Sequence, residues 1–314
     1  MRCLVTGAAG FIGSHLAVRL AERGDEVIGI DNFLDSYPRE VKEDRAAWIR
    51  GFEGIRFVEG DLMEADLEEL LEGVKVVFHQ AAQAGVRASW GQSFEVYTRN
   101  NILATQRLLE ACRKRPIERF VYASSSSVYG DKAPLPTPET TPTQPYSPYG
   151  VTKLAGEHLA MLYQANHGVP AVALRYFTVF GPRPRPDMAF CRFTRAMLSG
   201  EPIPIYGDGE QSRGFTHVTD VVDANLLAAE KPCVGEVFNI GGAIQLTVNQ
   251  VVACFEEVTG KKARVVREEA QKGDVRHTMA EVSKARDELG WEPKMPFMEG
   301  LAEHVRSVKQ FYGL

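Results

Sequence analysis

A tyrosine and a lysine four residues apart are the pair in this sequence best suited to acid–base chemistry. Tyr149 and Lys153 stand in the run 147–153, which reads SPYGVTK. Residues at this spacing share one face of a helix, so the Lys153 ammonium can approach the Tyr149 phenol. A free phenol ionises near pH ~10, and a nearby positive charge lowers that pKa. We therefore expect Tyr149 to exchange a proton with a substrate alcohol at neutral pH.

The first residues have the pattern of a strand, a glycine-rich turn and a helix. An apolar run at 2–6 precedes GAAGFIG, and residues 14–23 then show helical spacing of apolar side chains. In such a turn Gly7 allows the tight bend, Gly10 lets a pyrophosphate approach the backbone, and Gly13 lets helix and strand pack closely. Backbone N–H groups at the start of a helix attract phosphate. The pattern predicts a dinucleotide-binding turn.

An acidic residue follows the next expected strand. Residues 26–30 are of strand type and end at Asp31, eighteen residues after Gly13. A carboxylate at this place binds both hydroxyls of the adenosine ribose and repels a 2′-phosphate. We therefore expect the cofactor to be NAD rather than NADP.

Composition excludes several classes of protein. The 314 residues are 44% hydrophobic and 25% charged with a net charge of −5, which is typical of a globular protein and unlike a nucleic-acid binder. No apolar stretch approaches the ~20 residues that span a bilayer, and no leader precedes the first strand, so we expect a cytoplasmic protein without a membrane partner. The five cysteines are scattered and form no CxxC, which predicts reduced thiols and no metal site.

Strands and helices alternate through the first half of the chain. Strands are expected at 55–59, 75–78, 119–123 and 171–176, and helices at 66–71, 94–113 and 148–166. This alternation predicts an α/β fold with a Rossmann-type, doubly wound parallel sheet that binds ligands at the carboxyl ends of its strands.

The pattern becomes irregular after Tyr176 and predicts a smaller α/β substrate-binding lobe of loops and short helices. A helix expected at 220–230 implies that the chain returns to the first domain. We therefore divide the chain into an NAD-binding domain at 1–176, with return segments near 214–240, and a nucleotide-sugar-binding lobe at 177–213 and 241–314.

Several motifs occur together and in order. They are TGAAGFIGSH at 6–15, Asp31, the serine run 124–127 ahead of VYG, and the Tyr149/Lys153 pair. This set resembles the extended short-chain dehydrogenases/reductases, which are nucleotide-sugar epimerases and dehydratases with tightly bound NAD. The resemblance covers nearly the whole chain, and it implies that Ser125 is the third catalytic residue, bridging the sugar 4-OH and the Tyr149 oxygen.

The resemblance also implies the cofactor contacts. They comprise the glycine turn, the acidic positions after the second and third strands, the AAQ run after the fourth strand, and the catalytic helix. The residues are Gly7, Gly10, Phe11, Ile12, Gly13, Asp31, Asn32, Asp61, Leu62, Ala81, Ala82, Gln83, Asn100, Tyr149, Lys153 and Tyr176.

Departures from the family pattern narrow the reaction. Sugar 4,6-dehydratases carry an Asp-Glu pair directly after the catalytic Thr, whereas this chain has Ser126 and Ser127 there. Serine hydroxyls cannot serve as an acid–base pair of useful pKa, so we reject dehydration. Redox-sensing members of the fold, a non-enzymatic alternative, typically lack the Tyr or the Lys that this chain retains.

The segment TVFGPRPRPDMAF at 178–190, together with QAGVR at 83–87, resembles UDP-glucuronate 4-epimerases. A hexuronic acid carries a carboxylate at C6, and a two-point arginine contact is its best partner. Arg213 and Arg276 match positions that bind the substrate diphosphate, and Tyr206 is a candidate to stack on the base. The predicted substrate-binding residues are Arg87, Ser126, Ser127, Thr178, Arg185, Arg192, Arg213 and Arg276.

The mechanism that follows is a C4 epimerisation of UDP-glucuronate to UDP-galacturonate. Tyr149 takes the 4-OH proton while C4 gives hydride to NAD⁺, and hydride then returns to the opposite face of the sugar. Three alternatives stay open: a UDP-glucose 4-epimerase, a UDP-glucuronate decarboxylase, because a 4-keto uronic acid loses CO₂ readily, and a dehydrogenase that releases NADH. Relatives dimerise through helices equivalent to 94–113 and the Tyr149 helix, so we expect a homodimer.

Overall fold

The larger part of the molecule is built on one parallel sheet. The computed structural model describes residues 1–269 and 273–314. Seven strands lie in the order β10-β6-β5-β4-β1-β2-β3, and every neighbouring pair is parallel. This sheet confirms the predicted fold class. Its strands are β1 (Arg2–Thr6), β2 (Glu26–Asp31), β3 (Ile55–Glu59), β4 (Val76–His79), β5 (Arg119–Ser125), β6 (Ala171–Tyr176) and β10 (Val237–Ile240).

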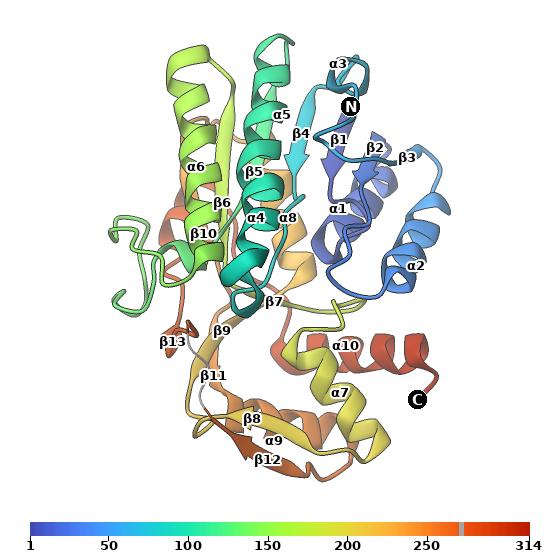
Figure 1. Cartoon of the computed structure of the whole chain (residues 1–314), viewed down its shortest axis with the longest axis vertical. Helices are drawn as coiled ribbons and strands as arrows, with labels where there is room; N and C mark the ends of the chain where they lie inside the picture. The colour runs from blue at the N-terminus through green and yellow to red at the C-terminus, as the bar shows by residue number, and fades with distance from the viewer. Residues whose placement is uncertain (270–272) are drawn as a thin grey trace.

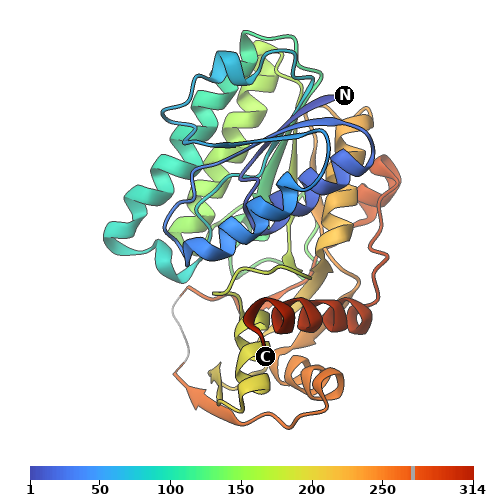
Figure 2. The same ribbon diagram turned by 90° about the vertical axis from the view of Figure 1, so that its right-hand side faces the viewer.

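Helices cover both faces of this sheet (Figures 1 and 2). Neighbouring residues of a strand point to opposite faces. Leu4 accordingly packs in one buried cluster with Leu108, and Val5 in the other with Leu16. The helices of the first face are α3 (Leu67–Leu70), α4 (Phe94–Tyr97), a π-helical turn (Thr98–Leu103), α5 (Ala104–Arg113) and α6 (Pro148–His167); those of the second are α1 (Phe11–Glu22), α2 (Arg39–Arg50) and α8 (Val218–Glu230).

The smaller lobe contains strands and helices, which confirms the predicted α/β lobe, whereas the expectation that loops and short helices make it up was wrong. An aromatic core that includes Phe180, Phe190 and Phe297 holds it together. Its elements are β7 (Thr178–Phe180), α7 (Ala189–Ser199), β8 (Ile203–Tyr206), β9 (Ser212–His217), β11 (Ile244–Thr247), α9 (Val248–Thr259), β12 (Val265–Glu268), β13 (His277–Thr278) and α10 (Phe297–Tyr312). Short 3₁₀ turns occupy Arg87–Ser89, Gly91–Ser93 and Ser126–Val128.

The chain passes between the two parts several times. Helix α8 packs on α1, and β10 extends the large sheet beside β6. A π-helical turn at Ala285–Leu289 and Trp291 also pack in the core of the large sheet, and the Trp291 indole donates to the Asp220 carbonyl at 2.8 Å. This segment falls within 241–314, which the sequence assigns to the smaller lobe, and its packing places it with the larger sheet instead.

The topology fixes where a ligand can bind. Strand β1 lies between β2 and β4; the chain runs from β1 to β2 on one side and crosses from β3 to β4 on the other side, which opens a crevice at the carboxyl ends of β1 and β4. Figure 1 shows the smaller lobe below this end of the sheet, with α10 between the two parts. Among the described residues, no helix is both long and apolar enough to cross a bilayer.

Candidate active site

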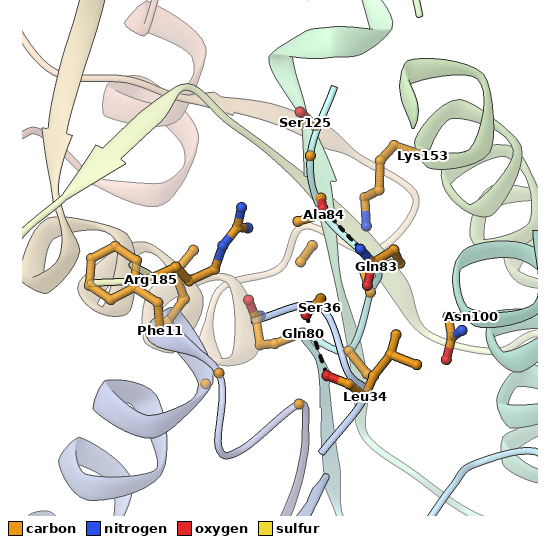
Figure 3. Close-up of a pocket in the computed structure, with 18 of the residues that line it drawn as sticks. Phe11, Leu34, Ser36, Gln80, Gln83, Ala84, Asn100, Ser125, Lys153 and Arg185 are labelled. Atoms are coloured by element: carbon orange, nitrogen blue, oxygen red, sulfur yellow. Dashed lines mark hydrogen bonds between the residues drawn. The ribbon is translucent and has the colours of Figure 1, made fainter. Parts of the chain in front are cut away.

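A cavity of about 460 Å³ lies at the carboxyl ends of the large sheet's strands. All sixteen residues predicted to contact the cofactor line it, and so does Ser125. Four of the predicted substrate residues also line it, namely Ser126, Ser127, Thr178 and Arg185. The structure therefore gathers the acid–base residues, the glycine turn and Arg185 around a single space. Figure 3 labels Ser125, Lys153 and Arg185 among the lining residues.

The glycine turn has the geometry that a pyrophosphate needs. Gly7 has a positive φ of 69°, and a Cβ on Gly13 would lie 2.2 Å from the Gly7 carbonyl oxygen. Only glycine fits such a close approach of helix to strand. Helix α1 begins after Gly10 without a side-chain cap, which leaves its first N–H groups free to bind an anion. The turn therefore fits the diphosphate of NAD.

Asp31 is fixed at the end of β2 by the backbone. Its two carboxylate oxygens accept hydrogen bonds from the N–H groups of Ala9 at 3.0 Å and Phe33 at 2.9 Å. Burial is the largest influence on Asp31 and raises its pKa, while the Lys42 ammonium acts in the opposite direction. Each carboxylate oxygen keeps a second lone pair, so the side chain is preorganised to accept from ribose hydroxyls. The adenosine end of NAD fits this side of the cavity.

Tyr149 lies in the first turn of α6, beside the end of β5. The Ser147 hydroxyl caps this helix by accepting from the Gly150 N–H at 3.2 Å, which orients the first turn. The Ser125 hydroxyl lies near enough to the Tyr149 phenol to lower its pKa, and the Tyr97 ring packs against the Tyr149 ring edge to face with centroids 6.2 Å apart. Strand β5 and helix α6 thus bring two hydroxyls together at one point of the cavity.

The electrostatics of Tyr149 differ from the expectation. Burial is the largest influence and raises the pKa of the phenol, while the Ser125 hydrogen bond and the Arg185 guanidinium lower it. The predicted net lowering of this pKa by Lys153 was therefore wrong for the chain by itself. Tyr149 and Lys153 do lie four residues apart on one helix, as predicted. The free-energy cost of ionising a phenol away from water, however, outweighs the effect of the groups that favour the phenolate.

Lys153 is almost fully buried, with 3% of its surface exposed. Its ammonium lies 4.5 Å from the centre of the Tyr122 ring. Burial lowers the pKa of Lys153 to about 7, and Glu157 one turn along the helix opposes this. Glu157 is itself paired with Arg175 at 2.6 Å in the interior. Lys153 can therefore gain or lose a proton near neutral pH.

Arg185 reaches into the cavity from the side opposite Lys153 (Figure 3). Asp187 accepts from two guanidinium nitrogens, Nε at 3.1 Å and Nη2 at 2.6 Å. A guanidinium has five N–H donors, so this pairing leaves donors for another acceptor. The arrangement places a fixed positive charge close enough to influence the Tyr149 phenol.

Three other predicted arginines form a group outside the cavity lining. Arg87 pairs with Asp274, and its guanidinium carbon lies 4.2 Å from the centre of the Tyr206 ring. Arg213 donates to the carbonyl oxygen of Arg276 at 3.1 Å and interacts electrostatically with Asp274 and Arg87. Arg87, from the larger part of the chain, therefore lies over the Tyr206 ring of the smaller lobe, with Arg213 and the Arg276 backbone nearby.

Arg192 joins neither the cavity nor this group. It lies on α7 and is partly buried, and its backbone N–H donates to the Met188 carbonyl at 3.1 Å. It is not among the residues that line the cavity. The prediction of a substrate contact at Arg192 gains no support from this placement.

Several residues of the cavity were not predicted. Tyr37 and Lys42 come from α2 and the loop before it, and Lys42 donates to the Leu34 carbonyl at 2.8 Å. Gln80 follows β4 and donates to Tyr176 at 3.1 Å and to Asn225 at 2.9 Å. Of these residues, Gln80 was the one that the sequence could have indicated, because it stands at a strand end directly before the AAQ run.

Comparison with known proteins identifies the family. A model of the NAD dependent epimerase/dehydratase family matches residues 3–241. The chain belongs to this family. Membership confirms the predicted relation to the extended short-chain dehydrogenases/reductases and NAD as the cofactor.

Three relatives of this epimerase/dehydratase chain are informative. It is 45% identical to an uncharacterized UDP-glucose epimerase of Bacillus subtilis, over 99% of each chain. It is 37% identical to a UDP-glucuronate 4-epimerase of Thermodesulfobacterium geofontis, over 98% of this chain and 96% of the relative. The structure of a UDP-glucuronic acid 4-epimerase from Bacillus cereus, in complex with UDP-glucuronic acid and NAD, superposes with a TM-score of 0.96 at 42% identity and covers 99% of this chain and 100% of that one.

Proposed function

We propose that the protein is an NAD-dependent UDP-glucuronate 4-epimerase that forms UDP-galacturonate. The observation that carries this proposal is the position of Arg185 in the same cavity as Tyr149, where a guanidinium can bind the C6 carboxylate of the sugar. The relatives from Thermodesulfobacterium geofontis and Bacillus cereus act on UDP-glucuronate by name, which supports the same substrate here.

In the proposed reaction Tyr149 takes the proton from the sugar 4-hydroxyl and later returns it. Ser125 donates to the same oxygen and stabilises the charge that develops there. NAD, when bound, supplies a reversible hydride acceptor beside the sugar ring. Lys153 lines the same cavity and would bind the nicotinamide ribose. Ser126, Ser127 and Thr178 offer further hydroxyls to the sugar.

We assign NAD binding to residues 1–176 with the return segments near 214–240, and binding of the nucleotide sugar to the smaller lobe. Arg87, Arg213 and Arg276 would bind the diphosphate, since Arg213 hydrogen-bonds the Arg276 carbonyl and interacts electrostatically with Arg87. Arg87 and Arg276 now pair with Asp274 and Asp208, so binding exchanges a carboxylate for a phosphate.

A UDP-glucose 4-epimerase is the second candidate. The relative from Bacillus subtilis carries that substrate in its name at 45% identity. Asp187 also gives Arg185 a counter-ion without any substrate carboxylate. Both observations are compatible with a neutral sugar.

One assay separates these functions. The purified protein is incubated with UDP-glucuronate and with UDP-glucose, and nucleotide-sugar products and CO₂ are measured. We expect UDP-galacturonate from UDP-glucuronate without added NAD and without net NADH. Conversion of UDP-glucose alone would reject the assigned substrate, and CO₂ as the main product would identify a decarboxylase.

We also propose a cytoplasmic homodimer. Apolar side chains along the first helical face are exposed, with exposed fractions of 48% for Leu103, 48% for Val151 and 56% for Leu162. A second copy of the same face would cover them as a four-helix bundle. All five cysteines are free thiols, which suits a reducing compartment.

A further inference from the structure

Arg45 on α2 is a buried arginine whose role neither the motifs nor the proposed reaction explains. Only 1% of its surface is exposed, and among the described residues no carboxylate lies within ion-pair distance of it. A buried cation without a counter-ion is costly unless oxygens satisfy its N–H groups. The oxygens that do so therefore indicate what the residue is for.

Those oxygens come chiefly from two loops of the active site. Arg45 donates from Nη1 to the Ala9 carbonyl at 3.3 Å, and Ala9 belongs to the glycine turn. It donates from Nε to the Arg183 carbonyl at 3.1 Å and from Nη2 to the Pro184 carbonyl at 2.6 Å. A fourth bond goes to the Tyr37 hydroxyl at 2.9 Å. One guanidinium thus joins the cofactor turn to the backbone directly before the cavity arginine.

The second loop has few backbone N–H groups of its own to hold it. Prolines at 182, 184 and 186 have no N–H to donate. Arg183 adopts a left-handed φ of 51°, which is rare for a residue other than glycine and persists only where the surroundings hold it. The other contacts of Arg183 are a hydrogen bond from its N–H to the Ser307 hydroxyl at 2.8 Å, an ion pair with Asp44, and a position 4.4 Å above the Trp48 ring.

We propose that Arg45 is a positioning residue: it fixes the position of the Arg185 guanidinium in the cavity and thereby the preference for a carboxylated sugar. The inference rests on the proposed function, in which Arg185 binds the C6 carboxylate. By fixing two consecutive carbonyls just before Arg185, Arg45 limits where that guanidinium can lie relative to Tyr149. A displacement of about 1 Å is enough to weaken such a two-point contact.

The test uses the enzyme with its retained NAD. Arg45→Met keeps the length and apolar stem of the side chain and removes every donor. We expect kcat/KM for UDP-glucuronate to fall by about 10- to 100-fold, mainly through KM, as expected for loss of hydrogen bonds from a charged group. Affinity for UDP-glucose and NAD released on denaturation should change by less than about 3-fold, because neither depends on Arg185. Arg50→Met, an exposed position on the same helix, is the matched control and should match the wild type.

Equal losses for both sugars, or loss of NAD, would overturn the inference, because Arg45 would then support the fold or the cofactor turn alone. If Arg45→Met does not fold, Ser307→Ala removes the acceptor of the Arg183 N–H. It should shift the same preference by about 2- to 5-fold, and an unchanged preference would overturn the inference.

Arg185→Met separates this inference from the proposed function. If Arg185→Met leaves the preference for UDP-glucuronate intact, the proposed function is wrong about the carboxylate contact. If it abolishes the preference while Arg45→Met does not, the inference about Arg45 alone is wrong.

Discussion

Asp187 and Arg185, which both line the cavity, form a two-point ion pair with N–O distances of 3.1 Å and 2.6 Å. The pair holds one edge of the guanidinium and leaves other donors for the substrate. Asp187 is partly exposed, so its contribution to orientation should be that of a surface pair, ~0.2–1 kcal/mol. We predict that Asp187→Asn raises KM for UDP-glucuronate by roughly 2- to 5-fold and leaves the affinity for UDP-glucose unchanged.

Steady-state kinetics with both nucleotide sugars would measure this effect. Glu43→Gln, which removes an exposed partner of Arg39 on α2, is the control for loss of a surface carboxylate. A lower KM in Asp187→Asn would mean that Asp187 competes with the substrate for Arg185 instead of orienting it.

Ser125 lowers the pKa of the Tyr149 phenol through a hydrogen bond, against the larger opposing effect of burial. Ser125→Ala removes that bond, so the pKa of Tyr149 should rise further. The reaction needs the phenolate, and the rising limb of kcat against pH should therefore move to higher pH. We also predict a loss of about 10²-fold in kcat at neutral pH with little change in KM. A pH profile of kcat that keeps its position would contradict this role for Ser125.

His79 should make the fold sensitive to acid. Its ring accepts from or donates to Thr6 at 2.8 Å and Thr105 at 2.9 Å, and burial lowers its pKa to about 3. Between pH ~6.5 and this value the unfolded chain binds a proton that the folded chain does not. Stability is therefore lost as the pH falls below ~6.5. In His79→Asn the slope of the free energy of unfolding against pH should be smaller by up to roughly 1.4 kcal/mol per pH unit.

Urea unfolding of wild type and His79→Asn at several pH values between 4 and 7 would measure the two slopes. The absolute stability of the variant is not the readout, because any change at this buried site alters packing. Identical slopes would show that His79 is not the group that is protonated on unfolding.

Leu103 and Leu162 are exposed on the helical face proposed for dimer contact. Replacing both by Arg places charges where two apolar faces meet, so the dimer should dissociate. Light scattering should report twice 34.8 kDa for the wild type and about 34.8 kDa for the variant. Phe311→Arg, at an exposed position near the end of α10, should leave the mass of the wild type unchanged. A monomeric wild type would reject the proposed homodimer.

The sequence predicted the large sheet well because its signals are local. A strand, a glycine turn and a helix follow one another within thirty residues, and the spacing of Tyr149 and Lys153 already defines one helix face. Helix α2 was not predicted because most of its residues are charged, which hides the helical spacing of its few apolar side chains. The roles of Lys42 and Arg45 on this helix, and of Tyr37 just before it, were therefore missed as well. The sequence also could not predict that the pKa of Tyr149 is raised, because the burial of Tyr149 depends on segments far away in the chain.

The smaller lobe shows the same limit. Its strands are short, and β9 pairs with β7, β11 and β13, which come from three distant segments. Neither alternation nor helical spacing reveals such pairing. This pairing of distant strands also brings Arg213 close to Arg276 and Arg87, so their proximity could be seen only in three dimensions.

The central claim is that the Tyr149 hydroxyl carries the proton of the sugar 4-OH. The most direct measurement is the turnover of UDP-glucuronate by Tyr149→Phe, with bound NAD and thermal stability measured on the same sample. We predict a loss of at least about 10³-fold in kcat, with the cofactor retained and the fold intact, because only the hydroxyl is removed. Turnover at the wild-type rate in Tyr149→Phe would contradict the account.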